Sequence, residues 1–482
     1  MNYQKTPIIE SLIKHKDREK HSFHVPGHRN GSLFKVYNSD NLFENVMEID
    51  QTELTGLDDL HSPSGCIEEA QLLLSKLYNS YKSYFLVGGS TIGNLAAIFS
   101  VCNYGDKVLV QRNCHKSIIN AIRLKELRPV FIDPKYDYNF ETSTYLDFES
   151  VKTALDTHID VKALILTSPN YYGLSSNYEN IITYTKKMGK VVICDEAHGA
   201  HYIIGKPFPK SVVQQGAHIT IQSAHKTLPA MTMASWLHVS NDFNKIDELE
   251  YHLGALQSSS PSYPIMASLD YARLFLQNYN EELRRELEMS IKELLNDIYN
   301  IPQLCVCYSE DLNIEQDILK IKINSNTKLN GFELQKELEK NGIFTELADH
   351  NGVLLVHPLK LLENKKEFIN DLYKSVKEFK VINRIKADNI YNNATSKITS
   401  LELNYQELSN YNTEYIDISD AENMICAQDI VPYPPGIPFI IKGERLTEPK
   451  LRLLKKYIHD NYYFQNAPFL KKGQIAVHKL RS

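Results

Sequence analysis

Two residues, Lys226 and Asp195, have the types and the setting needed for covalent chemistry. Lys226 ends a Ser-x-His-Lys turn after the apolar segment 218–222, and Asp195 lies 31 positions earlier, directly after the apolar run 191–194. An amine between apolar segments is poorly solvated, so it loses its proton more readily and can attack an aldehyde. A buried carboxylate nearby can keep a pyridine nitrogen protonated. The pair therefore predicts an enzyme that holds pyridoxal phosphate (PLP), with Lys226 bound to the aldehyde and Asp195 facing the ring nitrogen.

A glycine-rich loop offers a place for the phosphate of such a cofactor. The segment 88–91, which contains Ser90 and Thr91, follows an apolar run and begins an expected helix. Free N–H groups and the positive end of that helix would attract an anion, although the pattern alone also fits an ordinary capped helix. Because neither GxGxxG nor GxxxxGK(S/T) is present, we expect a monophosphate and not a pyrophosphate. Ser223 could hold the same phosphate, and His225 could assist.

The histidine-containing segments allow other interpretations. The box Asp-Glu-Ala-His at 195–198 is also found in helicases, but the chain has no GxxxxGK(S/T) loop and a formal net charge of -6, which argue against work on nucleic acid. His198 and His201 lack the His-x-x-x-His spacing, and no ligand-rich segment follows them, so we predict no metal. His115 follows another apolar run, where it could lie flat on an aromatic cofactor or be an ordinary polar loop residue.

Seven short apolar runs between residues 80 and 240 predict the strands that position these side chains. The long connections between them indicate a largely parallel sheet with helices on both faces. The last connection has eleven residues, includes Pro229 and lacks a helical period, so we expect the final strand to be antiparallel. Ligands bind such sheets at the carboxyl ends of the strands, where all of these motifs would gather. The predicted strands are 83–87, 107–111, 129–132, 163–167, 191–194, 218–222 and 234–239.

The rest of the chain predicts further domains. A long amphipathic helix is expected at 265–299, and a polar linker at 381–400. Between them we expect a small α/β unit with strands 318–323 and 352–357 and helices 331–341 and 366–378. The predicted division is an N-terminal segment (1–80) that packs on a large domain (81–300), a small α/β domain (301–385) and a C-terminal α+β domain (400–482).

Composition narrows the class of protein. The chain has 482 residues with 43% hydrophobic and 23% charged residues, which is typical of a soluble globular protein of two or three domains. It has no stretch of about 18 apolar residues that could cross a membrane. Seven dispersed cysteines indicate a reducing compartment. The first residues lack the apolar region of a secretory signal, so we expect a cytoplasmic protein without nucleic-acid or membrane partners.

Motifs along nearly the whole chain resemble, in order, the ornithine/lysine/arginine decarboxylases of PLP fold type I. The resemblance is to the shorter bacterial form, which lacks an N-terminal wing domain. Two of the motifs, Gly-Leu-Asp-Asp-Leu-His at 56–61 and Tyr-Pro-Pro-Gly-Ile-Pro at 433–438, are specific to this family. The segments that carry the resemblance are 24–31, 52–61, 89–91, 113–117, 195–201, 223–229, 258–263 and 432–438.

The resemblance implies the transferase fold of PLP enzymes, with a seven-stranded, mostly parallel sheet, and a role for each site residue. Lys226 would carry the cofactor as a Schiff base, Asp195 would pair with the pyridine nitrogen, and His115 would stack on the ring. Ala197 would pack on the opposite ring face, with His198 close by. The serine loop at 258–260 would reach the phosphate of a neighbouring subunit and so require a homodimer. The residues expected to contact the phosphate are Ser90, Thr91, Ser223, His225 and Ser258.

The activity implied by the resemblance is decarboxylation of arginine, lysine or ornithine to an amine and CO2, in polyamine metabolism. His198, His225 and Lys226 are candidates for returning a proton to the α-carbon. Many relatives carry Glu where Gln428 stands and Pro where Lys442 stands, in a C-terminal segment that could shape the pocket for the distal amine, so the substrate stays open. A third departure, Ala224 in place of Thr, should be mild.

Three alternatives remain open. An aminotransferase or a C–S lyase of the same fold could share the cofactor residues. The chain could also bind PLP without catalysis, as a silent or regulatory protein. A module that does not bind PLP is the third, and a colourless purified protein would favour it.

Overall fold

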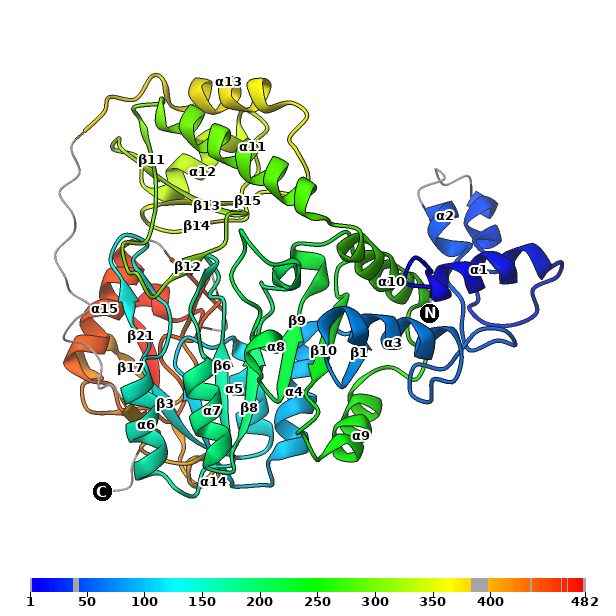
Figure 1. Cartoon of the computed structure of the whole chain (residues 1–482). Helices are drawn as coiled ribbons and strands as arrows, with labels where there is room; N and C mark the ends of the chain where they lie inside the picture. The colour runs from blue at the N-terminus through cyan, green and yellow to red at the C-terminus, as the bar shows by residue number, and fades with distance from the viewer. Residues whose placement is uncertain are drawn as a thin grey trace. The chain divides into compact units, whose positions relative to one another are not determined.

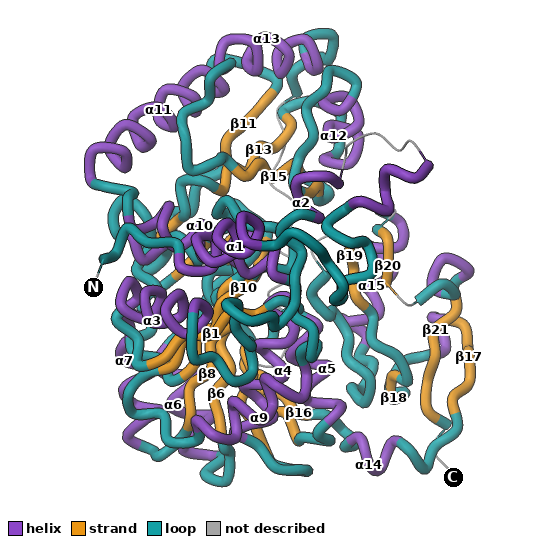
Figure 2. The backbone as a smooth tube through the Cα atoms, turned by 90° about the vertical axis from the view of Figure 1, so that its right-hand side faces the viewer, coloured by secondary structure: helices purple, strands orange, loops and turns teal. Residues whose placement is uncertain are grey.

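The computed structural model (Figures 1 and 2) describes residues 2–37, 43–382, 398–433, 436–460, 462–465 and 467–479. The chain forms two compact units, each built from segments that are distant in the sequence. The first unit comprises Met1–Val101, Val191–Lys206 and Lys210–Leu283, and the second comprises Cys102–Lys190, Pro207–Pro209 and Arg284–Ser482. Within the described ranges, no helix is long and apolar enough to cross a membrane.

The first unit contains four of the seven predicted strands. Strands β8 (Val191–Asp195) and β9 (Ile219–Gln222) run parallel. Strand β10 (Ser235–Val239) is antiparallel to both β9 and β1 (Lys82–Leu86). The prediction of an antiparallel final strand is therefore confirmed, because an eleven-residue connection is too short for a crossover helix. In order across the sheet, the strands are β1 (Lys82–Leu86), β10 (Ser235–Val239), β9 (Ile219–Gln222) and β8 (Val191–Asp195).

Helix α4 (Gly89–Val101) packs along these strands, as Figure 1 shows. Gly93 permits a close approach, because a Cβ there would lie only 2.7 Å from the Ile221 side chain and 2.8 Å from that of Leu86. The helix therefore holds its first turns against the strands that carry the predicted site residues.

The other helices of the first unit surround this core. Helices α1 (Pro7–Arg18), α3 (Cys66–Tyr78) and α10 (Tyr263–Gln277) pack against one another, and α3 and α10 also contact β1. The Asp58 carboxylate accepts hydrogen bonds from the backbone N–H groups at the start of α3, which fixes the beginning of that helix. The remaining helical elements are η1 (Ser32–Tyr37), α2 (Glu44–Met47), η3 (Tyr202–Ile204), α8 (Val212–Gln215), η4 (Ala224–Lys226) and α9 (Ile246–Leu256).

In the second unit, the other three predicted strands pair with one another and with β16. Strands β6 (Ala163–Thr167), β2 (Lys107–Gln111) and β3 (Arg128–Ile132) lie in this order and run parallel, and β16 (Ile398–Ser400) is antiparallel to β3. The sequence does not predict β16, because it ends a polar stretch. The accompanying elements are α5 (Lys116–Leu124), β4 (Tyr136–Asp137), β5 (Thr142–Ser143), α6 (Phe148–Thr157), β7 (Leu174–Ser175), α7 (Glu179–Lys187) and β12 (Glu315–Gln316).

The predicted small α/β unit is also present. Its sheet has the order β11 (Leu304–Val306), β13 (Lys320–Ser325), β15 (Gly352–Val356) and β14 (Leu347–Ala348). Figure 2 shows this sheet beside α12 (Gly331–Glu339) and α13 (Lys365–Val376). The C-terminal elements are α14 (Tyr405–Leu408), β17 (Thr413–Asp417), η6 (Ile418–Asp420), β18 (Ile425–Cys426), β19 (Val431–Tyr433), α15 (Glu448–His459), β20 (Tyr463–Gln465), η7 (Leu470–Lys472) and β21 (Gln474–His478).

One helix prediction is wrong. The expected helix 265–299 is two helices, α10 and α11 (Glu281–Tyr299). The break falls at Asn278-Tyr279-Asn280, where the Asn280 side chain accepts a hydrogen bond from the backbone N–H of Leu283 at 3.0 Å and so begins α11. Most of the predicted linker (383–397) lies outside the described residues, and the four-domain division stays a prediction.

Candidate active site

Lys226 lies at the end of the 3-10 turn η4, directly after β9. Its side chain is half-buried, and its Nζ atom is 2.9 Å from Nε2 of His198, a buried residue in the turn after β8. The turn is held by hydrogen bonds from the Lys226 N–H to the Ser223 carbonyl and from the Ser223 N–H to the Ala197 carbonyl, both 3.3 Å long. The amine is therefore positioned by the ends of two parallel strands and does not extend into bulk water.

Asp195 is the last residue of β8, and its register partner on β9 is Ile221, five residues before Lys226. Its carboxylate is 3% exposed and accepts a hydrogen bond from the Asn94 side chain at 2.8 Å and another from the Ala197 N–H at 3.1 Å. Both donors act on the carboxylate, so they fix its orientation.

Three serine hydroxyls meet at the start of α4. The Ser90 Oγ atom lies 2.7 Å from Ser223 Oγ and donates to Ser235 Oγ at 3.3 Å. All three serines are buried, and Ser90 is in the first turn of the helix, where backbone N–H groups are free to bind an anion. Thr91, also predicted to bind phosphate, is exposed in the same turn. The hydroxyl cluster suits a monophosphate.

The pKa of the His225 imidazole, in the same turn as Lys226, is lowered from its ordinary value. Burial lowers its pKa, a hydrogen bond to the Ala234 carbonyl partly offsets that effect, and the positive charge of Lys226 lowers the pKa further. The Nδ1–H group donates to the Ala234 carbonyl at 2.9 Å, which leaves Nε2 as the acceptor.

The exposed loop 258–260 is anchored to other predicted motifs of the first unit. The His61 ring donates from Nε2 to the Ser258 carbonyl at 2.8 Å, and the Tyr263 hydroxyl donates to the Asp58 carbonyl at 2.5 Å. The motifs at 56–61 and 258–263 therefore lie together in the first unit. Ser258 itself is exposed, and its expected contact with a neighbouring subunit stays a prediction.

His115 belongs to the second unit and is the N-cap residue of α5. The backbone N–H of Ser117 donates to its Nδ1 atom at 3.2 Å, so that nitrogen carries no proton. This bond fixes the plane of the ring at the end of β2. Its expected stacking on the cofactor stays a prediction.

Several residues with a structural role in the site are not found by sequence reasoning. Asn94 supports Asp195, and its position four residues after Ser90 on the same helix face is a signal that could have identified it. Ser235 completes the hydroxyl cluster, but only the antiparallel pairing of β10 brings it there.

Glu196 connects the strand ends that carry the site. It is fully buried and accepts hydrogen bonds from the Ser211 hydroxyl (2.7 Å), the Val212 N–H (2.6 Å) and the Gln222 amide (2.7 Å). Burial raises the pKa of Glu196 to about 7, although these three bonds act in the opposite direction. Because Gln222 precedes Ser223, the bond between Glu196 and Gln222 ties the turn of Asp195 to the turn of Lys226.

The chemistry of this donor set fits PLP. An amine, an oriented carboxylate and a cluster of hydroxyls at a helix start correspond to the aldehyde, the pyridine nitrogen and the phosphate of that cofactor. All of these groups belong to the first unit.

Comparisons of the sequence with family models and with curated proteins agree on one family. The model of the Orn/Lys/Arg decarboxylase major domain matches residues 6–306, and that of the family's C-terminal domain matches residues 385–466. The chain is 43% identical to the uncharacterized protein YaaO of Bacillus subtilis (strain 168), with 98% of each chain covered. It is 31% identical to an arginine decarboxylase of the same organism, over 95% of this chain and 94% of the relative.

The fold is similar to that of solved decarboxylases. The lysine decarboxylase LdcF of Francisella novicida matches 99% of this chain and 81% of its own, with a TM-score of 0.82 at 19% identity. The predicted fold class is therefore confirmed, as are the predicted enzyme class and cofactor. The chain belongs to the Orn/Lys/Arg decarboxylase family, and it is a PLP-dependent decarboxylase.

Proposed function

We propose that the chain decarboxylates arginine, lysine or ornithine to the corresponding amine and CO2, as a step of polyamine metabolism in the cytoplasm. Arginine is the substrate to test first, because relatives with 30% and 31% identity over nearly the whole chain are named arginine decarboxylases. The observation that carries the proposal is the position of the Lys226 amine, which lies 2.9 Å from His198 in the turn after β9, the strand next to that of Asp195.

Lys226, Asp195, His198 and His115 are the proposed catalytic residues. When bound, PLP supplies an electron sink for the electron pair that departing CO2 leaves on the α-carbon. Asp195 would hold a proton at the ring nitrogen, Lys226 would hold the cofactor through its Nζ atom, and His115 and Ala197 would pack on the ring. The proposed phosphate ligands are Ser90, Thr91, Ser223 and His225.

Return of a proton to the α-carbon is assigned to the pair Lys226 and His198. A proton on either side chain can pass along their 2.9 Å contact. His225 is a weaker candidate, because its pKa is lowered by burial and its Nδ1–H is already donated to the Ala234 carbonyl.

We also propose a homodimer as the smallest active form. The loop 258–260 is exposed but anchored, since the neighbouring Gln257 side chain accepts a hydrogen bond from the Val87 N–H at 2.9 Å, next to the phosphate loop. Such a loop can present Ser258 to a second copy of the chain.

The test is an assay of the PLP-loaded protein with arginine, lysine and ornithine in separate reactions. CO2 and the amine should form in equal amounts from one of the three. Formation of a keto acid without CO2 would indicate an aminotransferase. Bound PLP without turnover of any of them would indicate a silent PLP-binding protein.

A further inference from the structure

Three side chains of types that bind metals meet at the end of α1, within the first unit (Figure 1). They are His15, Glu19 and His24, and we call them the His15 cluster. Their ligand atoms all lie within 4.8 Å of one another. His15 and Glu19 are one helical turn apart, and His24 returns to them from the loop that follows the helix. The spacing His-x3-Glu-x4-His is not one of the usual zinc motifs, so the sequence does not predict this cluster.

The Glu19 carboxylate lies between the two imidazole rings. Its Oε1 atom is 2.6 Å from Nε2 of His24, and its Oε2 atom is 3.4 Å from Nε2 of His15. Bonds from zinc to such ligands are about 2.0–2.2 Å long, which places two ligand atoms of a tetrahedron roughly 3.4 Å apart. The distance from Glu19 to His15 already has this value. The contact with His24 would lengthen when an ion replaces the proton that the two groups share.

His15 provides an independent indication that something binds in the cluster. The residue is 8% exposed, and its Nε2 atom is buried without a hydrogen-bond partner among the residues that the structure describes. At the other ring nitrogen, the Arg18 guanidinium is 3.5 Å away, at the limit of a hydrogen bond, and it already donates to the Thr55 carbonyl. A buried nitrogen that faces a carboxylate without bonding to it suits an ion held between the two.

Outer hydrogen bonds orient the other two members of the cluster. The Nδ1–H group of His24 donates to the Val25 carbonyl at 2.7 Å, which directs Nε2 into the cluster. The Asn30 amide donates to Oε2 of Glu19 at 2.9 Å, and the Gln51 amide donates to the oxygen of Asn30 at 3.0 Å. Histidines and carboxylates that bind metals are usually fixed by such bonds, so the arrangement is that of prepared ligands.

Another histidine of the same family motif is arranged differently. Nε2 of His28 is 3.1 Å from the Asp50 carboxylate, and its Nδ1 atom accepts a hydrogen bond from the Gly31 N–H at 3.1 Å. Both ring nitrogens therefore make ordinary hydrogen bonds, and neither lone pair is left for an ion. The contrast distinguishes the His15 cluster from a histidine that has only a structural role.

We propose that the His15 cluster binds one Zn²⁺ ion through Nε2 of His15, Nε2 of His24 and the carboxylate of Glu19. Two nitrogens and a carboxylate oxygen suit zinc, which completes its tetrahedron with water when the protein supplies three ligands. Magnesium and calcium prefer sets of oxygen ligands and fit less well. The ion would fasten the motif at 24–31 to the end of α1. None of the three ligands is a proposed catalytic residue, so the inference is independent of the proposed function.

Titration calorimetry of the PLP-loaded protein with zinc chloride tests the site, with magnesium chloride as the second probe. One Zn²⁺ should bind per chain, and Mg²⁺ should not compete. Glu19→Gln should weaken zinc binding by about 100-fold or more, since even the loss of an outer partner such as Asn30 costs about 10- to 100-fold. His21→Gln is the matched control, because His21 is an exposed histidine of the same loop outside the cluster. It should leave the affinity unchanged.

Thermal unfolding adds a second measurement and shows whether each variant folds. Zinc should raise the unfolding midpoint of wild type and of His21→Gln, but not that of Glu19→Gln. If Glu19→Gln does not fold, His24→Gln gives the same test at a less buried position. No saturable zinc binding, or equal binding by wild type and the ligand variants, would overturn the proposal. Zinc binding by a protein without decarboxylase activity would uphold the site and reject only the proposed function.

Discussion

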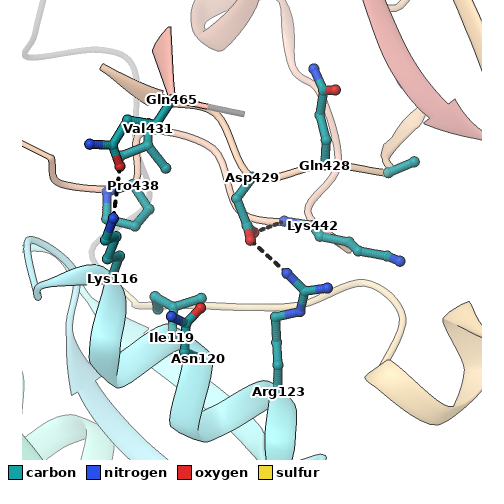
Figure 3. Close-up of a pocket in the computed structure, with 11 residues that line it drawn as sticks. Lys116, Ile119, Asn120, Arg123, Gln428, Asp429, Val431, Pro438, Lys442 and Gln465 are labelled. Atoms are coloured by element: carbon teal, nitrogen blue, oxygen red, sulfur yellow. Dashed lines mark hydrogen bonds and ion pairs between the residues drawn. The ribbon is translucent and has the colours of Figure 1, made fainter. Parts of the chain in front are cut away.

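The Lys226 site and a pocket of the second unit that is lined by Lys116, Lys442 and residues around them (the Lys442 pocket, Figure 3) hold lysines in opposite ways. At the Lys226 site, the amine contacts a buried histidine, and the polar groups of Asp195 and Ser223 are hydrogen-bonded to side chains of α4. In the Lys442 pocket, the ammonium groups have no carboxylate partner among the described residues, and one wall is a helix face. The first arrangement suits chemistry, which needs oriented groups, whereas the second does not bring its lysines to one point.

The largest expected effect comes from Lys226. Lys226→Ala removes the group that bonds to the cofactor, so kcat should fall by about 10³-fold or more and the absorbance of bound cofactor should change. Lys226→Arg is the informative companion, because it keeps a positive charge beside His198 and should be equally inactive. If Lys226→Arg kept most of the activity, the site would act by charge alone.

Asp195 should rank second. Asp195→Ala removes the carboxylate that holds the ring proton, and kcat should fall by about 10²- to 10³-fold while some PLP stays bound. Asn94→Ala removes one of the two hydrogen bonds to that carboxylate and should cost less. Steady-state kinetics with measured cofactor occupancy would show this order, and an unimpaired Asp195→Ala variant would count against the assigned role.

Glu196 should make stability depend on pH. Its folded pKa of about 7 is above the ordinary value of 4.5, so the folded protein binds more protons in that interval and loses stability as pH rises through it. Glu196→Gln cannot titrate, so its stability relative to wild type should rise between pH 5 and pH 8, by up to about 3 kcal/mol.

Unfolding midpoints of wild type and Glu196→Gln, measured at about pH 5 and about pH 8, give this difference in stability. Glu248→Gln, at an exposed glutamate of α9, is the control and should follow the wild type. A relative stability of Glu196→Gln that stays flat across the interval would mean that Glu196 is ionised throughout, and the buried tie between the strand ends would need another explanation.

The smallest expected effect concerns the hydroxyl cluster. Ser235→Ala removes one hydrogen bond of about 1 kcal/mol, so the affinity for PLP should fall about fivefold in a titration of the cofactor-free protein. Ser100→Ala tests a buried serine of the same helix α4 whose hydroxyl bonds only within the helix. Equal losses in both variants would mean that the helix, and not the phosphate site, is affected.

The sequence alone is sufficient to predict the seven strands and the site residues at their ends. All seven predicted strands are present, since buried strands are short apolar runs whose ends are marked by polar motifs. The positions of Lys226, Asp195 and His198 follow from this, because parallel neighbours bring their carboxyl ends together. Helix boundaries are not set by the apolar pattern alone. The break at Asn278–Asn280 is missed, because the apolar period continues across it.

The supporting groups could not be predicted, because they depend on contacts between distant segments. Ser235 joins the site only through the antiparallel pairing of β10. The Lys442 pocket combines α5 with residues more than 300 positions later, and no motif marks it. The departures at Gln428 and Lys442 can be read from the sequence, but only the structure shows that both residues line one pocket.

The central claim is that the Nζ atom of Lys226 bonds covalently to PLP. Borohydride makes such a bond permanent, so reduction of the PLP-loaded protein followed by mass mapping of its peptides tests the claim directly. The cofactor mass should appear on Lys226 and on no other lysine of the first unit. A cofactor that stays unattached after reduction, or one found on a different lysine, would contradict the account.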